Sequence, residues 1–349
     1  MEPLHPSEPS AALASFSQGV GLPWRRVQPG GLINTTWVVG DPPVFVLQRV
    51  SAIFPEAIHA RIREVTEHIA QRGLPTPRLY AAADGRLSLP GPEGTRWRLM
   101  DFVPGITHER VTGPPMATEA GALVGRFHRA MLDFPGDLTP LRPDPHDTPR
   151  HMASLQGALA ACAEHRLAAG IRALGERVLA GWERWQRRFS LDGLPVRAAH
   201  GDLKLSNLRF DEAGRALCLL DLDTLSSMPL CCELGDALRS WCNRAGEGGR
   251  AAEVDLEVYA AALSAWHASA GFATRAELAS LAGGTWRICL ELAARFGADA
   301  YHETYFGWDP AQAPGRGEHN LIRAQSQLAL ADAVERRLLD LERAAPQPA

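Results

Sequence analysis

The octapeptide HGDLKLSN, residues 200–207, is the stretch that decides the fold. It places a histidine, a carboxylate, a lysine and a carboxamide at short fixed intervals. Twelve residues later the chain reads LLDLD at residues 219–223, an apolar run that ends in carboxylates. Aspartate and asparagine are also common in ordinary turns, so a turn without chemistry is the alternative. The joint pattern and its spacing favour a reactive site.

The spacing of this octapeptide resembles the catalytic loop of protein kinases, which reads H-R-D-L-x-x-x-N. Gly201 stands where that loop has arginine. The resemblance implies phosphoryl transfer, in which the enzyme mainly positions the reactants and neutralises charge. We expect Asp202 to accept the proton of the attacking hydroxyl. Lys204 lies where its ammonium could meet the transferred phosphate.

Three oxygen-bearing side chains of the same pattern are candidates for holding Mg²⁺. Asn207 would bind it through the amide oxygen, and Asp221 would connect it to the nucleotide phosphates, with Asp223 as a further ligand. Mg²⁺ takes few protein ligands because it keeps water and phosphate oxygens around it. ATP and Mg²⁺ are therefore the expected cofactors.

The composition describes an ordinary globular protein. The chain has 349 residues, 46% of them hydrophobic and 22% charged, which allows two lobes with a sizeable core. A net charge of −4 argues against a nucleic-acid partner. No apolar run is long enough to span a bilayer, and residues 1–10 lack the pattern of a signal peptide. Six cysteines without a C-x-x-C pair indicate free thiols, so we expect a cytoplasmic protein.

The order of predicted elements indicates an α+β fold of the two-lobed, protein-kinase-like kind. We expect a small β-rich N-lobe over residues 1–102 and a large, mostly helical C-lobe over residues 103–349. The N-lobe is predicted to hold one helix at residues 55–72 and strands at 35–39, 44–50, 87–89 and 96–102, the first two forming a hairpin. Helical periodicity in the C-lobe predicts helices at 118–132, 151–170, 171–189, 233–242, 254–269, 275–295 and 319–341, before a frayed tail at 344–349.

The N-lobe departs from kinases at the strand where they carry a phosphate-binding lysine. Gln48 occupies that place, followed by Arg49. Alternation along a strand sends these two side chains to opposite faces, so only one of them can reach the nucleotide. The helix partner is expected to be Glu64 or Glu67, and a solvated helix face is the alternative for either.

Two further segments are expected near the nucleotide. Residues 29–34, PGGLIN, form a small-residue loop that could cover phosphates or be a plain turn. Asp101 and Val103 flank the strand end before Pro104-Gly105, where the linker of a two-lobed kinase hydrogen-bonds adenine through its backbone.

Several segments scattered from about residue 30 to 335 resemble one group of small-molecule kinases. They are DLDT at 221–224, GDALR at 235–239, VLQRV at 46–50, VTEH at 65–68 and HNLIRAQ at 319–325. The chain resembles the aminoglycoside phosphotransferase-like kinases, and most strongly the N-acetylhexosamine 1-kinases. That resemblance implies transfer of the ATP γ-phosphoryl group to the anomeric hydroxyl of an N-acetylhexosamine.

The resemblance also implies where the sugar binds. Arg295 and Tyr305 match sugar-binding positions of those kinases, whereas a helix cap and a core aromatic are the alternatives for them. Arg239, Trp241 and Asp236 lie after the metal strand and could border the same pocket as Asp202 and its acceptor.

Two other functions stay open at this point. The acceptor could be an aminoglycoside, a choline-like amine or a homoserine-like alcohol, with the acidic stretch at residues 247–257 facing a cation. The absent lysine would also suit a pseudokinase that binds nucleotide without turnover, although the retained base and metal residues oppose this. The epimer accepted, the oligomeric state and the pathway do not follow from the sequence.

Overall fold

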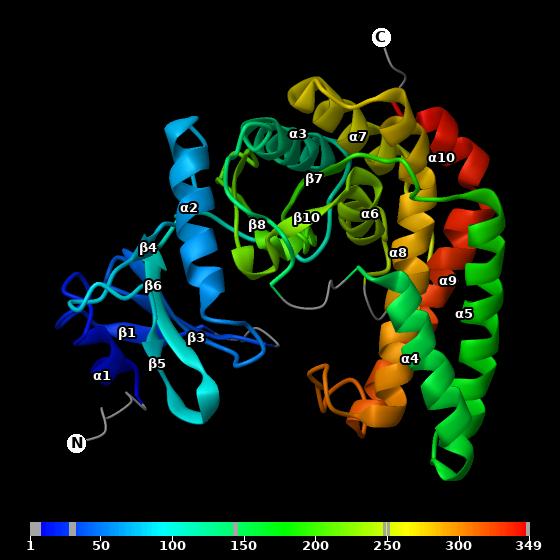
Figure 1. Cartoon of the computed structure of the whole chain (residues 1–349), viewed down its shortest axis with the longest axis horizontal. Coiled ribbons are helices and arrows are strands. Elements are labelled where there is room, and N and C mark those ends of the chain that lie inside the picture. The colour runs from blue at the N-terminus through cyan, green and yellow to red at the C-terminus, as the bar shows by residue number, and fades with distance from the viewer. Residues whose placement is uncertain (1–7, 28–32, 142–145, 247–248, 250–251, 347–349) are drawn as a thin grey trace.

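The computed structural model describes residues 8–27, 33–141, 146–246, 249 and 252–346. It has two lobes of different composition (Figure 1). One is a small antiparallel sheet with two helices, and the other is larger and mostly helical. The predicted α+β class with a β-rich N-lobe is confirmed, while the boundary at residue 102 stays a prediction. The predicted phosphate loop at 29–34 falls largely outside the described residues.

The N-lobe sheet is built around the predicted hairpin. β2 and β3 pair antiparallel, and the strands run in the order β1-β2-β3-β6-β4, with β5 also paired to β6. The strands β1 and β4 were not predicted, because two or three residues show no period. The bounds are β1 Trp24–Arg26, β2 Thr35–Val39, β3 Phe45–Val50, β4 Leu79–Tyr80, β5 Leu89–Pro90 and β6 Arg96–Asp101.

The two faces of this sheet have different roles. One face packs its apolar side chains against α1 (Pro9–Leu13), forming a separate small core. Arg49 belongs to this side, since its guanidinium lies over the Trp97 ring, 5.9 Å from the centroid. On the opposite face, strand register sets Gln48 directly between Thr36 and Arg98. Of the two side chains, Gln48 therefore faces the C-lobe and Arg49 faces away from it.

The helix α2 (Ala57–Gln71) is the predicted helix of the N-lobe, and its apolar face joins the core of the C-lobe. Ile58, Ile62 and Val65 are buried in one cluster with residues of α3 and of the catalytic segment. Figure 1 shows α2 standing between the sheet and α3. The lobes are therefore held together by hydrophobic packing along α2.

The C-lobe is organised around α8 (Arg275–His302), which packs most extensively against α4, α5, α6 and α9. The helices α3 and α7 also pack closely against each other. A Cβ at Gly121 would lie 2.1 Å from the carbonyl oxygen of Ala262, so only glycine allows this approach. The remaining bounds are α3 Pro114–Ala130, α4 Thr148–Ala161, α5 Ala168–Arg188, α6 Leu230–Trp241, α7 Leu256–Ala270, α9 Arg316–Arg336 and α10 Leu338–Ala344.

Three predicted helix ends were wrong. The helix expected to reach residue 170 ends at Ala161, and a 3₁₀ turn leads into α5. The helix expected to stop at 295 continues to His302, and the residues from Phe296 to Ala300 are buried in the C-lobe. The last predicted helix is two helices, α9 and α10, and the second ends at Ala344, where the tail was expected to begin; residues 347–349 lie outside the described part.

The catalytic segment lies between these helices on four short strands, β7 (Val196–Ala199), β8 (Leu208–Phe210), β9 (Ala216–Leu219) and β10 (Ser226–Pro229). β7 pairs with β10 and β8 with β9, both antiparallel. All six cysteines are buried with free thiols, as expected. Within the described ranges, no helix combines the length and apolarity that crossing a membrane requires.

Candidate active site

The octapeptide that follows β7 is held in place by carboxylates of α6. Glu233, which is fully buried, accepts hydrogen bonds from the backbone N–H groups of His200 at 2.7 Å and Gly201 at 2.9 Å. Asp236, one helical turn later, accepts from the N–H of Leu203 at 2.8 Å. Hydrogen bonds to ionised acceptors are the stronger ones, so α6 fixes the backbone of the loop firmly.

Gly201 replaces the kinase arginine for a local steric reason. Its φ is +80°, in the left-handed region, and a Cβ there would lie 2.5 Å from the carbonyl oxygen of Thr224. The Thr224 hydroxyl donates to the His200 carbonyl at 2.8 Å, which keeps the two segments at this distance. The catalytic loop and the segment after Asp221 therefore pass too closely for any side chain at position 201.

Asp202, Lys204 and Asn207 meet as predicted. The Lys204 ammonium donates to Oδ2 of Asp202 at 2.7 Å, and the Asn207 amide donates to the same oxygen at 3.0 Å and to the Asp202 carbonyl at 2.9 Å. Among the described residues, both side-chain contacts of this carboxylate use Oδ2. Oδ1 is therefore the oxygen that an acceptor hydroxyl can reach, and the Asp202 side chain is 26% exposed.

The charges around Asp202 keep it ionised. Burial acts to raise the pKa of this carboxyl, but the adjacent Lys204 ammonium, with smaller effects from His200 and Arg239, brings the pKa below its ordinary value. Burial likewise opposes the charge on Lys204, yet the Asp202 and Asp221 carboxylates raise its pKa above the ordinary value. Asp202 and Lys204 thus stabilise each other in their charged forms.

Asp221 has the properties of a metal ligand. Its backbone is left-handed, with φ 60° and ψ 59°, which is unusual for a residue other than glycine and is a feature of functional sites. Burial and the nearby Asp223 carboxylate raise its pKa to about 6. A divalent cation would relieve this repulsion, and the amide oxygen of Asn207 supplies a second hard ligand. The donor set fits Mg²⁺ bound jointly with phosphate oxygens, rather than an all-protein cage.

Asp223 does not take part in this donor set, which corrects the sequence prediction. Its carboxylate forms a buried ion pair with Arg98 of β6 and accepts a 2.8 Å hydrogen bond from the Asn34 amide. The Arg98 and Asp223 side chains are 2% and 1% exposed. Both oxygens of Asp223 are therefore used by N-lobe donors, because the sheet places Arg98 directly over the segment after Asp221.

The predicted partner of Gln48 was also wrong. The oxygen of Gln48 accepts from Arg98 Nε at 3.0 Å and from a second Arg98 nitrogen at 2.7 Å, and its amide donates to Thr36 at 3.1 Å. Glu64 and Glu67 are exposed on α2, and Glu67 lies 4.0 Å from Arg63. Both glutamates follow the solvated alternative, because α2 turns its buried face toward the C-lobe core.

The segment between the lobes leaves a backbone donor available. Asp101 uses its carboxylate to accept from the Tyr80 hydroxyl at 2.6 Å and the Arg78 N–H at 3.0 Å. The Val103 carbonyl accepts from Arg209 Nε at 2.9 Å. In the described part of the chain, the Val103 N–H makes no hydrogen bond, which leaves it free to bind a ligand.

Arg239 and Trp241 are buried supports of the loop. Arg239 donates to Asp236 at 2.8 and 3.0 Å, and its charge contributes to lowering the pKa of Asp202. The Trp241 indole N–H donates to the Leu203 carbonyl at 2.9 Å, and the side chain is buried. The expectation that Trp241 borders the substrate pocket is therefore corrected: its ring lies behind the loop, because nearly every side chain of α6 is buried.

Arg295 and Tyr305 come together through Phe306. The Arg295 guanidinium lies 5.6 Å from the Phe306 ring centroid, and the Tyr305 ring packs edge-on against the same ring at 4.8 Å. Asp299 holds this turn by accepting from the Tyr305 and Phe306 N–H groups at 3.0 and 2.9 Å. The Tyr305 side chain is left 47% exposed at the end of α8.

The sequence is similar to one known family over most of its length. The family described as "Phosphotransferase enzyme family" matches residues 24–278, well over half of the chain. The chain belongs to this family. It is thus a phosphotransferase that acts on small-molecule alcohols, as predicted, and the family generally uses ATP with a divalent metal ion.

Solved structures show the fold of this phosphotransferase. A microcompartment-associated aminopropanol kinase matches with a TM-score of 0.65 at 18% identity, covering 95% of this chain and 97% of that one. An aminoglycoside phosphotransferase from Alicyclobacillus acidocaldarius matches with 0.61 at 14%, covering 97% and 98%. An amicoumacin kinase in complex with AMP-PNP and Ca²⁺ matches with 0.55 at 10%, covering 93% and 90%. Such identities establish the kinase-like fold alone.

The phosphotransferase has a buried polar cluster that was not predicted from the sequence. His146 lies 2.9 Å from Glu291, the Thr148 hydroxyl donates to Glu291 at 2.5 Å, and Arg295 approaches it at 3.9 Å. Burial acts to lower the pKa of His146, but the Glu291 carboxylate outweighs this and raises it to about 9. His146 is therefore a cation at neutral pH. The interruption of an apolar helix by Glu291 was the available signal.

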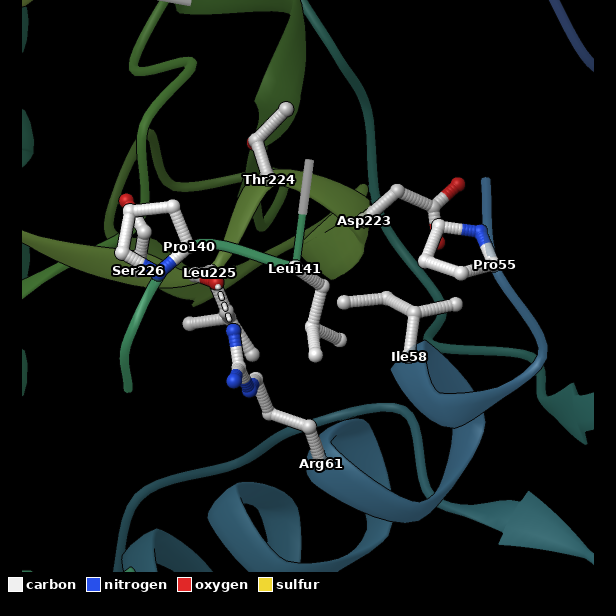
Figure 2. A pocket seen from close by; sticks show the side chains of 9 residues that line it. All are labelled: Pro55, Ile58, Arg61, Pro140, Leu141, Asp223, Thr224, Leu225 and Ser226. Atoms are coloured by element: carbon white, nitrogen blue, oxygen red, sulfur yellow. Dashed lines mark hydrogen bonds between the residues drawn. The ribbon is translucent and has the colours of Figure 1, made fainter. Parts of the chain in front are cut away.

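A small pocket lies beside the ion pair of Asp223. Figure 2 shows it between the start of α2, residues Pro140 and Leu141, and the segment from Asp223 to Ser226. Arg61 reaches across it and donates to the Leu225 carbonyl at 3.1 Å and to the Thr139 carbonyl at 2.7 Å. The start of α2 is thus tied to the segment that follows Asp221.

Proposed function

We propose that this phosphotransferase transfers the γ-phosphoryl group of ATP, with Mg²⁺, to the anomeric hydroxyl of an N-acetylhexosamine. The observation that carries the choice of a neutral acceptor is the charge state around Arg295 and Tyr305. There Arg295 supplies a guanidinium, while the buried carboxylate of Glu291 is already engaged by His146, Thr148 and Arg295. The exposed Tyr305 ring, with the Arg295 guanidinium on the same Phe306 ring, suits an uncharged polyol.

The chain's own groups account for the proton transfer. Oδ1 of Asp202 accepts the proton of the sugar hydroxyl while Lys204 and Asn207 hold Oδ2. An anomeric hydroxyl is more acidic than an ordinary alcohol, so a carboxylate of low pKa can assist its deprotonation. Lys204 also contributes positive charge where the phosphoryl group passes.

The nucleotide side combines a metal-binding pair, a backbone site for adenine and an indirect contact through Arg98. Asn207 and Asp221 would hold Mg²⁺, which neutralises phosphate charge when bound. The free N–H of Val103 would bind adenine, together with the backbone carbonyl of Asp101, whose own N–H donates to the Arg78 carbonyl at 3.1 Å. Gln48 would act on the phosphates only through Arg98, since both of its polar atoms are engaged.

An amino alcohol is the second candidate acceptor, favoured by the fold likeness to an aminopropanol kinase. A cationic acceptor needs carboxylates that are free to pair with it. In the acidic stretch offered for this role, Asp255 is not free, since it caps α7 by accepting from the Glu257 and Val258 N–H groups and pairs with Arg244. Glu253 and Glu257 are exposed near the start of α7. Glu247 lies outside the described residues.

A panel of acceptors tests the proposal. Purified protein is incubated with Mg-ATP and, separately, N-acetylglucosamine, N-acetylgalactosamine, glucose, 1-amino-2-propanol, choline and kanamycin, and each product is identified by ³¹P and ¹H NMR. We expect phosphate at C1 of an N-acetylhexosamine. Phosphorylation of an amine-bearing alcohol with no reaction of any sugar would overturn the sugar assignment. The variant Arg295→Met should raise KM for the sugar with little effect on KM for ATP.

A further inference from the structure

Arg98 is the most completely engaged buried cation at the seam between the lobes. Its residue exposure is 1%, and its guanidinium donates to Gln48 on one side and to both oxygens of Asp223 on the other. An arginine offers five N–H donors in a fixed fork, and four such contacts use most of them. A buried guanidinium held in this way has one defined position.

This guanidinium stands beside the place where kinases of this fold carry a lysine. Position 48 on β3 holds a neutral amide, and β6 places Arg98 directly opposite it in the strand register. The positive charge has therefore moved to the neighbouring strand, about one strand spacing away, which is roughly 5 Å. It still faces the C-lobe, because directly opposite residues of an antiparallel pair share a face.

The contact with Asp223 connects this charge to the metal-binding residue. Asp223 lies two positions after Asp221, in the 3₁₀ turn Leu222–Thr224. Asn34, which directly precedes β2, donates from its side-chain amide to the same carboxylate. The side-chain oxygen of Asn34 accepts from the Ser51 N–H at 3.0 Å. Two N-lobe side chains thus hold the turn that directly follows the left-handed backbone of Asp221.

We propose that Arg98 is a positioning residue that, in a protein without the β3 lysine, neutralises Asp223 and holds the turn so that Asp221 faces Mg²⁺ and the nucleotide. The inference rests on the proposed use of Mg-nucleotide, and it is independent of the acceptor. Asp221 is then the one carboxylate of this pair left to bind the metal ion. Loss of a group that orients a metal ligand typically weakens metal binding by about 10- to 100-fold.

The first test compares Arg98→Met with Arg61→Met. Arg61 is the matched control, since it is a buried arginine at the same seam that donates to carbonyl groups and not to Asp223. Thermal unfolding of the apo proteins and calorimetric titration with Mg-AMP-PNP are measured for both. We expect a Kd at least about tenfold higher in Arg98→Met and one within about twofold of the parent in Arg61→Met, with both variants less stable. Equal Kd values in the two variants would show that Arg98 is only structural.

A second set of variants keeps the test valid should Arg98→Met fail to fold. Arg98→Lys retains the positive charge, so it should bind Mg-AMP-PNP more tightly than Arg98→Met does. If Arg98→Met does not fold, Arg98→Lys should still fold. In the Arg98→Met background, Gln48→Lys returns a cation to β3 and should recover at least part of the lost affinity, and Asp223→Asn should recover apo stability. Failure of both rescues would overturn the inference. A parent protein that does not bind Mg-AMP-PNP would instead overturn the proposed function, and this inference with it.

Discussion

The ammonium of Lys204 lies 2.7 Å from Oδ2 of Asp202, and each group stabilises the charge of the other. The pair is set by a two-residue spacing in the loop and by α6, which anchors the backbone on both sides through Glu233 and Asp236. A base whose pKa is held low stays ionised at neutral pH. A low pKa makes Asp202 a weak general base, so its contribution to the rate has to come from its position beside the acceptor hydroxyl.

Removal of Lys204 should move the acid limb of the pH–rate profile. In Lys204→Met the factor that lowers the pKa of Asp202 is absent and burial remains, so the pKa of Asp202 rises. Activity, which needs the ionised carboxylate, is then lost at a higher pH as the pH falls. We expect the limb of kcat/KM to move up by about one pH unit or more, with a lower plateau.

Lys204→Arg is the control for this prediction, because it keeps a positive charge beside Asp202. Its acid limb should stay close to that of the parent protein even where kcat falls. An unmoved acid limb in Lys204→Met would show that the ion pair does not govern the ionisation of Asp202.

Gly201 should not tolerate a side chain. Gly201→Ala meets both a left-handed backbone and a carbonyl oxygen at 2.5 Å. Gly193→Ala is the matched control, since Gly193 has φ +75° with open space around its Cβ position. We expect the control to cost about 1–2 kcal/mol of unfolding free energy and Gly201→Ala about 2–5 kcal/mol. Chemical denaturation measures both, and equal losses would contradict the steric account.

Much of the fold could be predicted because its signals are local. The β2–β3 hairpin, α2 and most C-lobe helices follow from period and turn residues that lie next to one another in the sequence. The proposed base Asp202, its lysine and the proposed metal-binding amide of Asn207 lie within eight residues, and the structure brings them together. These parts of the site depend little on the rest of the chain, which is why their pattern indicates phosphoryl transfer without a structure.

The remaining parts depend on contacts between distant segments. Arg98 and Asp223 are 125 residues apart, and their pairing follows from strand register, which no local pattern reveals. Because this pairing is not visible in the sequence, Asp223 was predicted to be a metal ligand. Trp241 was predicted to border the pocket because α6 is buried on nearly all sides. The sequence of α6 therefore shows no polar face from which the direction of the Trp241 side chain could be inferred.

The His146–Glu291 pair should make stability depend on pH in a defined window. The folded pKa of His146, about 9, lies above the unfolded value of 6.5. Its contribution to stability is therefore complete below pH 6.5 and is lost as the pH rises through 9. We expect a loss on the order of 1–3 kcal/mol between these values, measured by denaturation at each pH.

His146→Gln separates this effect from other titrations. The variant lacks the titrating ring, so its unfolding free energy should fall less between pH 6.5 and 9 than that of the parent protein. Parallel pH profiles for the two proteins would mean that His146 is not the charged partner of Glu291.

The most direct test of the central claim compares Asp202→Asn with the parent protein in two assays on the same preparation. One assay follows Mg-ATP-dependent phosphorylation of the acceptor, and the other measures binding of Mg-AMP-PNP. Because the amide keeps the shape of the site but cannot accept the proton, we expect turnover to fall by about 10²–10⁴-fold while the Kd for nucleotide stays within a few fold. Near-parental kcat in Asp202→Asn would contradict Asp202 as the catalytic base and the mechanism built on it.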